Sequence, residues 1–193
     1  MGTDVFYAGF DNKQKSLTSY NLTARSLDGN TQDDAVLDHY WELFYDAIDV
    51  CNNALKYIPL NDFISDATKE QYLGEVYFLR ALYYSQMVAL WGPIPYMSEP
   101  VSAPVSTTPV RVPEAEVYKN ILTDIDAAIE HLTAGGMTTK ANGGLEAKAT
   151  VPAAKALKAR VALYAASWLG NNSVDGYSNL YQIAQTAAED VIA

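Results

Sequence analysis

The sequence predicts an all-α protein built from antiparallel helix pairs, with long irregular loops between them. Apolar residues recur at steps of three or four along several long segments, as they do on a buried helix face. Clusters of Pro, Gly, Asn and Ser separate those segments. No segment of useful length alternates apolar and polar residues in the manner of a half-buried strand. Together these observations favour helices that bury their apolar faces against one another.

The first helix is predicted to begin at Asp33 or Asp34, either of which suits the N-cap position, and to run to about Ile58. Pro59 ends it, because proline cannot continue a helix. One apolar stripe follows its length: Val36, Tyr40, Phe44, Ile48, Cys51 and Leu55. Residues 1–32 are polar and turn-rich, so we expect an irregular N-terminal arm there.

The second helix is predicted to begin at Asp66 or Thr68, and it contains most of the stretch GEVYFLRALYYSQMVALWGPIPY, residues 74–96. It carries two apolar faces, which predicts a helix buried between neighbours on both sides. One face is Tyr72, Val76, Leu79, Tyr83, Met87 and Leu90; the other is Leu73, Tyr77, Ala81, Tyr84, Val88 and Trp91. Glu75 and Arg80 interrupt these faces. Because buried charges need partners, we expect each to meet another helix or a loop.

Glycine and proline punctuate the rest of the chain. Gly92 is suited to cap the second helix, and the proline-rich residues 93–112 predict a long extended link. A third helix is predicted over residues 113–132, with proline at its first turn. A fourth, rich in alanine, spans about residues 151–169, and a fifth begins near Asn179.

Two of these helices end alike, at Leu90-Trp91-Gly92 and at Trp168-Leu169-Gly170, 78 residues apart. Repeated antiparallel helix pairs are typical of tetratricopeptide-like solenoids, although the 34-residue period is not visible here. We therefore expect one helical scaffold domain over residues 1–193. Trp91 and Trp168 are both interpreted as core residues.

Composition excludes some classes of partner. The formal net charge is −10 and the isoelectric point about 4.5, which disfavours nucleic acid because phosphate binding depends on clustered Lys and Arg. No run of 18 apolar residues could cross a bilayer. Fourteen tyrosines predict extensive helix–helix contacts or a surface that stacks on ligands, and we favour contacts for most of them.

The sequence contains little that indicates catalysis. His39 and His131 lie far apart and are interpreted as partly exposed imidazoles, and Cys51 as a small core residue. No catalytic residue, metal site or cofactor is predicted, because no group of residues has metal-ligand or nucleophile spacing. The acidic pairs, each interpreted as lying at a helix start or on a polar face, are Asp33-Asp34, Glu114/Glu116 and Asp124/Asp126.

Four blocks of the sequence resemble the SusD/RagB family of Bacteroidetes, in the family's order and spacing over about residues 36–192. They are YWELFYDAIDVCNNAL, GEVYFLRALYYSQMVALWGPIPY, VYKNILTDIDAAIEHL and AAKALKARVALYAASW. The combination of Gly-Glu, Phe-Leu-Arg-Ala and Trp-Gly-Pro-Ile-Pro is specific. The resemblance implies a tetratricopeptide-like helical scaffold that supports a less regular, ligand-binding part.

The same resemblance implies a function. Such proteins are cell-surface, outer-membrane lipoproteins that capture glycans or other nutrients, without catalysis, for a SusC-like TonB-dependent transporter. The lipidated cysteine of the family is missing, and Cys51 cannot replace it. Members are also much longer, so the chain is expected to be the N-terminal scaffold portion of a longer protein, truncated at its C-terminus.

Three residues are the predicted ligand contacts: Arg25, Asn30 and Trp41. A sugar site needs an aromatic platform beside fixed hydrogen-bonding groups, and the arm and the start of the first helix offer both. For Trp41 a role as a scaffold aromatic remains open. Two other functions also remain open: a helical-repeat adaptor that binds a protein segment, and, less favoured, an α/α glycoside hydrolase.

Overall fold

The structure is a computed structural model that describes residues 32–101, 109–138 and 148–192, with side chains from His39 onward. It divides into two compact units, residues 1–46 and 47–193. The predicted irregular arm lies outside the described residues. The single scaffold domain that we expect from the sequence remains a prediction.

The first described helix, α2 (Gln32–Tyr57), belongs to both units. It begins one residue before the predicted caps and is followed by a short 3₁₀ helix, Ile58–Leu60, that contains Pro59. In the first unit, the ring of Trp41 lies 5.0 Å from that of Tyr45, centroid to centroid. Trp41 is half-buried there.

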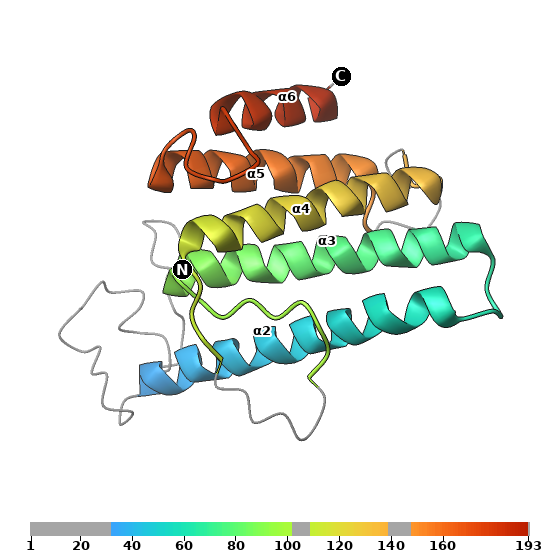
Figure 1. Ribbon diagram of the computed structural model, residues 1–193, viewed down its shortest axis with the longest axis horizontal. Coiled ribbons are helices and arrows are strands. Elements are labelled where there is room, and N and C mark those ends of the chain that lie inside the picture. Colours follow the sequence, from blue (N-terminus) through green and yellow to red (C-terminus); the bar gives the residue numbers. More distant parts are fainter. Residues whose placement is uncertain (1–31, 102–108, 139–147, 193) are drawn as a thin grey trace, which may run out of the picture. The chain divides into compact units, whose positions relative to one another are not determined.

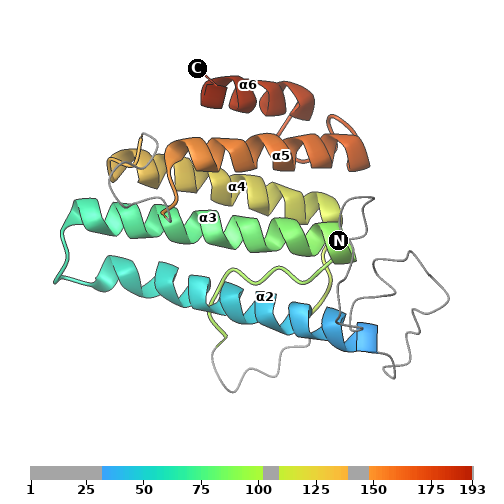
Figure 2. The same ribbon diagram turned by 180° about the vertical axis from the view of Figure 1, so that it is seen from behind.

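Four further helices make up most of the second unit: α3 (Asp66–Trp91), α4 (Glu114–Ala134), α5 (Val151–Leu169) and α6 (Leu180–Ile192). They lie side by side in chain order and alternate in direction (Figures 1 and 2). Among the described residues the only β-structure is two isolated bridges, Ile94–Val112 and Val174–Tyr177. The prediction of an all-α fold of antiparallel helices is therefore confirmed.

Helix α3 begins at Asp66, one of the two predicted starts. Ser65 is the N-cap, and its hydroxyl oxygen accepts a hydrogen bond from the Thr68 backbone N–H at 3.2 Å. Asp66 instead occupies the first turn, where its negative charge complements the helix dipole.

The prediction that α3 is buried on both sides is only half right. Its second face is buried and packs closely on α4: a Cβ at Gly74 would lie 2.6 Å from Cγ of Leu132. The other face is partly open to solvent, since Tyr72, Leu79 and Leu90 are exposed. Two apolar faces in the sequence therefore correspond to one tightly packed face and one that is only partly covered.

Small residues make up much of the face that α5 buries: alanines 154, 162, 165 and 166 are buried, together with Leu157 and Val161. Small side chains let neighbouring helices approach closely. No helix among the described residues has the length and apolar character needed to cross a membrane.

Candidate functional site

Only one of the three predicted ligand contacts, Trp41, lies among the described residues. Arg25 and Asn30 lie outside them. Trp41 lies on α2 in the first unit, next to Tyr45. The predicted group therefore remains a prediction, and the described chemistry lies elsewhere, in a buried polar network and in an aromatic groove.

The buried polar network consists of Asn52, Arg80, Tyr96 and Asp124, which we call the Arg80 network. The guanidinium of Arg80 donates to both carboxylate oxygens of Asp124, from Nε at 2.8 Å and from Nη2 at 2.7 Å. Its Nη1 donates to Oδ1 of Asn52 at 2.8 Å, and the Tyr96 hydroxyl donates to Oδ2 of Asp124 at 3.1 Å. The network therefore joins α2, α3, α4 and the link after α3.

Burial and pairing set the charges of this network. Burial opposes the charge on Arg80, but its hydrogen bonds and ion pair with Asp124 outweigh that cost and raise the pKa of the guanidinium. Burial, and then the nearby Asp124 carboxylate, raise the pKa of Tyr96 well above its ordinary value, so that hydroxyl stays protonated and can donate. Arg80 thus has the partners from other elements that the sequence predicted.

The Arg80 network also corrects one interpretation. Asp124 was placed with Asp126 on a polar helix face, but it is only 4% exposed. Asp126 does lie at the surface, paired with Lys158 of α5. Linear spacing did not show that position 124 lies opposite Arg80.

The link after α3 is held to the helices through its backbone. The Tyr84 hydroxyl donates to the Met97 carbonyl at 3.0 Å and accepts from the Met97 N–H at 2.7 Å. The side-chain amide of Asn52 donates to the carbonyls of Met97 and Glu99. Side chains thus make the hydrogen bonds that these backbone groups would form with a neighbouring strand in a sheet. The Tyr84 hydroxyl and the Asn52 amide therefore stabilise the position of the link.

The other residues singled out in the sequence have structural roles. Cys51 is buried, and burial raises the pKa of its thiol to about 11, so it is protonated at neutral pH. His131 is half-buried, as predicted, with Nδ1 2.6 Å from Oε2 of Glu70. Glu75 has a cationic partner in Lys148, Nζ to Oε1 at 3.9 Å. Within the described ranges, no three His, Cys, Asp or Glu side chains form a candidate metal site.

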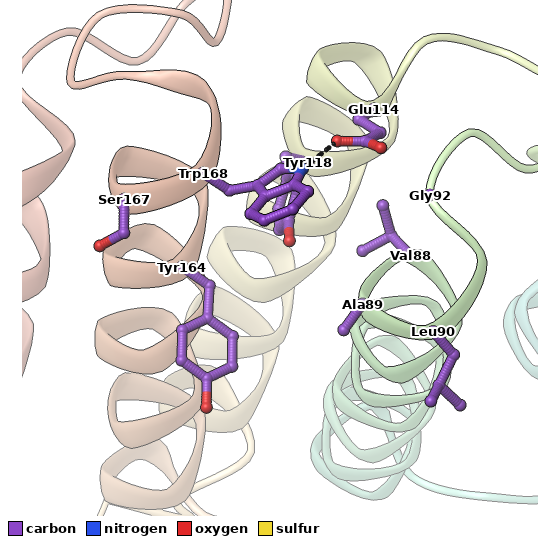
Figure 3. Close-up of a pocket in the computed structure, with 9 residues that line it drawn as sticks. All are labelled: Val88, Ala89, Leu90, Gly92, Glu114, Tyr118, Tyr164, Ser167 and Trp168. Atoms are coloured by element: carbon purple, nitrogen blue, oxygen red, sulfur yellow. Dashed lines mark hydrogen bonds between the residues drawn. The ribbon is translucent and has the colours of Figure 1, made fainter. Parts of the chain in front are cut away.

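A groove of about 390 Å³ lies over one end of α3, α4 and α5, and we call it the aromatic groove (Figure 3). Its lining residues are Val88, Ala89, Leu90 and Gly92 from α3 and the turn after it, Glu114 and Tyr118 from α4, and Tyr164, Ser167 and Trp168 from α5. This volume falls in the lower part of the range of small-molecule sites, about 300–1,000 Å³.

One hydrogen bond organises the aromatic groove. The indole Nε1 of Trp168 donates to Oε2 of Glu114 at 2.8 Å, so the ring extends from α5 toward α4 (Figure 3). Tyr118 is buried beside them, and burial, with Glu114 and Tyr164 adding to it, raises the pKa of its phenol. An aromatic ring held by a carboxylate at the rim of an apolar hollow can bind a ligand that has both apolar and hydroxyl groups.

The interpretation of Trp168 as a core residue is wrong. Its side chain is 75% exposed, and Tyr164, one turn earlier, is 54% exposed. The sequence contained a signal against this interpretation, because Ala154, Leu157, Val161 and Ala165 already provide a buried face of α5 at helical spacing. Trp91, also interpreted as core, is half-buried.

Comparisons with known proteins agree with the resemblance found in the sequence. The SusD-like family model described as "Starch-binding associating with outer membrane" matches residues 3–163. A SusD-like protein of Formosa agariphila is 30% identical over 141 residues, which cover 68% of this chain and 27% of that protein. The chain thus spans little more than a quarter of the length of the curated relatives it matches.

Solved structures share the fold. A SusD-like protein from Bacteroides fragilis superposes with a TM-score of 0.65 at 28% identity, covering 80% of this chain and 26% of that one. A laminarin-binding SusD-like protein superposes with a TM-score of 0.64 at 24% identity, covering 79% of this chain and 29% of that one.

Proposed function

The chain belongs to the SusD-like family, and from that premise we propose that it is part of a non-catalytic, cell-surface protein that captures glycans or other nutrients for import. The observation that supports this proposal most is the family match over residues 3–163. It includes the N-terminal arm, the signature helix α3 and its link. The family's description as starch-binding favours carbohydrate as the ligand class.

The described structure fits binding rather than turnover. Its buried acid, Asp124, is fully occupied by Arg80 and Tyr96. General acid–base catalysis of glycoside cleavage needs two carboxyl groups that converge on one bond, and Asp124 is not free to supply one of them. The Arg80 network supports a scaffold role instead.

We assign the primary ligand contacts to Arg25, Asn30 and Trp41. A guanidinium, an amide and an indole provide donors, acceptors and an apolar face, which together suit a sugar ring. Trp41 is half-buried, so part of its side chain is open for contact.

The partner in this proposal is a SusC-like TonB-dependent transporter, and the location is the outer surface of the outer membrane. A lipid anchor upstream of this chain would hold the protein there. The transporter would then receive the captured ligand directly.

Isothermal titration calorimetry on the full-length protein tests the ligand class. With maltohexaose and laminarihexaose as probes, we expect binding that Trp41→Ala weakens roughly tenfold, because a stacked aromatic contributes up to about 1.5 kcal/mol beyond area burial. Tyr57→Ala, which removes an exposed aromatic at the other end of α2, is the control and should bind normally. Equal affinity in both variants would remove Trp41 from the site, and shortened oligosaccharides after incubation would contradict a non-catalytic role.

Co-purification tests the partner. The full-length protein and the TonB-dependent transporter encoded beside it should elute together from detergent-solubilised outer membranes. Separate elution, or recovery of the protein from the soluble fraction of lysed cells, would contradict the proposed complex and location.

A further inference from the structure

We infer that the aromatic groove is a second sugar-contact site, which takes one neutral pyranose ring against Trp168 and a sugar hydroxyl at Glu114. It uses residues other than Arg25, Asn30 and Trp41. The inference rests on the proposed function only for the class of ligand. The groove itself is defined by side chains of α3, α4 and α5.

Trp168 provides a platform that is both exposed and held in place. Its side chain is 75% exposed, which leaves the ring open to a ligand, while the bond from Nε1 to Glu114 restricts its rotation. A ring that is already oriented loses little conformational freedom when a ligand stacks on it, so more of the contact energy appears as affinity. Tyr164, on the same side of α5, adds a second aromatic wall (Figure 3).

Glu114 provides the acceptor. One carboxylate oxygen, Oε2, accepts from Trp168, and no hydrogen bond found among the described residues uses Oε1. A carboxylate that accepts from a hydroxyl forms a strong, charge-assisted hydrogen bond. Gly92 leaves room for this oxygen, because a Cβ at that position would lie 2.7 Å from Oε1.

The charge of the aromatic groove selects among ligands. No Lys, Arg or His is among its lining residues, and Glu114 carries the only formal charge there. An anionic sugar would be repelled by that carboxylate. An apolar protein segment would cover Glu114 without offering a donor, which is costly for a charged group. A neutral sugar covers the apolar walls with its C–H groups and offers a hydroxyl to Oε1.

The indole N–H resonances of ¹⁵N-labelled protein report on this site directly. The chain has three tryptophans, and the spectrum of Trp168→Phe identifies the signal of Trp168. We expect maltohexaose or laminarihexaose to shift that signal in the unaltered chain and equally in Trp41→Ala. Glu114→Ala should weaken the interaction roughly tenfold, the effect of losing a hydrogen bond to a charged group. Circular dichroism and the urea midpoint would show that each variant is folded.

Other outcomes would overturn the inference in distinguishable ways. If the sugars shift the Trp41 signal and leave that of Trp168 unmoved, the groove fails as a sugar site while the proposed function stands. If neither signal moves with either sugar, both fail. If choline chloride shifts the Trp168 signal and the sugars do not, the groove is a cation site. If Glu114→Ala and Glu114→Gln both bind as the unaltered chain does, Glu114 is not the acceptor.

Discussion

The ends of α3 and α5 carry nearly the same residues and have different environments. Both helices end at a glycine whose N–H donates to the carbonyl four residues earlier, at 3.0 Å for Gly92 and 3.1 Å for Gly170. Both glycines have positive φ, 67° and 112°. Yet Trp91 is half-buried, whereas Trp168 is 75% exposed.

Two physical differences account for this. Trp91 immediately precedes its glycine and Trp168 comes two residues before, and one residue turns a side chain by about 100° around a helix. The segments that follow also differ. After Gly92 the link returns over the helices, with Ile94 buried and bridged to Val112. After Gly170 the chain forms a local turn in which the Asn171 carbonyl accepts from the Leu180 N–H. A shared end signal therefore fixes where a helix stops, but not which side chains it buries.

The largest expected effect comes from the Arg80 network, which holds the link against the middle of α3. Arg80→Leu leaves the Asp124 carboxylate buried without its cation, so we expect the free energy of unfolding to fall by about 3–5 kcal/mol in urea titrations. Lys119→Leu breaks an ion pair with the exposed Asp175 and is the matched control, with a much smaller loss because water screens that pair. Similar losses in the two variants would show that burial of the pair does not matter.

Alanine substitutions of the two tryptophans measure how much each ring contributes to stability at its helix end. Trp91→Ala removes a half-buried ring, so we expect a loss of about 2 kcal/mol, roughly half the cost for a fully buried aromatic. Trp168→Ala should cost under about 0.5 kcal/mol, since a mostly exposed side chain contributes little to folding. Equal costs by urea titration would mean that the two helix ends are packed alike.

Alanine at the two glycines separates a backbone effect from a contact effect. We expect each substitution to cost about 1–3 kcal/mol, because both glycines have backbone angles that are unfavourable for residues with a Cβ. Only Gly92→Ala should also move the Trp168 indole N–H resonance, because its Cβ would displace Glu114, whereas nothing lies within 4 Å of a Cβ at Gly170. A resonance that moves in both variants would mean that general destabilisation, and not Glu114, is responsible.

At neutral pH the smallest expected effect on stability concerns Cys51, which precedes the Asn52 that binds the link. Its folded pKa, raised by burial from 9.0 to about 11, means that the folded chain holds this proton while the unfolded chain releases it. Stability is therefore unaffected at neutral pH and falls as the pH rises from about 9 to 11. Reaction with a thiol-specific disulfide reagent at pH 8 should be about a hundredfold slower in the folded chain than in urea. Equal rates would contradict burial of this thiol.

Much of the fold could be predicted because its signals are local. Gly92 and the prolines after it located the end of α3, and the alanine-rich segment predicted α5 over residues 151–169. The partners of Arg80 could not be predicted, because Asn52 and Asp124 lie 28 and 44 residues away and meet it only when three helices pack. The aromatic groove was missed for the same reason: Glu114 and Trp168 are 54 residues apart.

The Arg80 network has a consequence for how the helices align. The planar guanidinium of Arg80 must reach both carboxylate oxygens of Asp124 on α4 and the amide oxygen of Asn52 on α2 at the same time. Apolar surfaces, in contrast, tolerate small slides and rotations. Moving α3 along its axis by one turn, about 5.4 Å, would separate Arg80 from Asp124 and leave a buried charge without its partner. We expect this single arginine to select one register of α3 against its neighbours. The apolar contacts of its tyrosines, leucines and alanines alone would accept several.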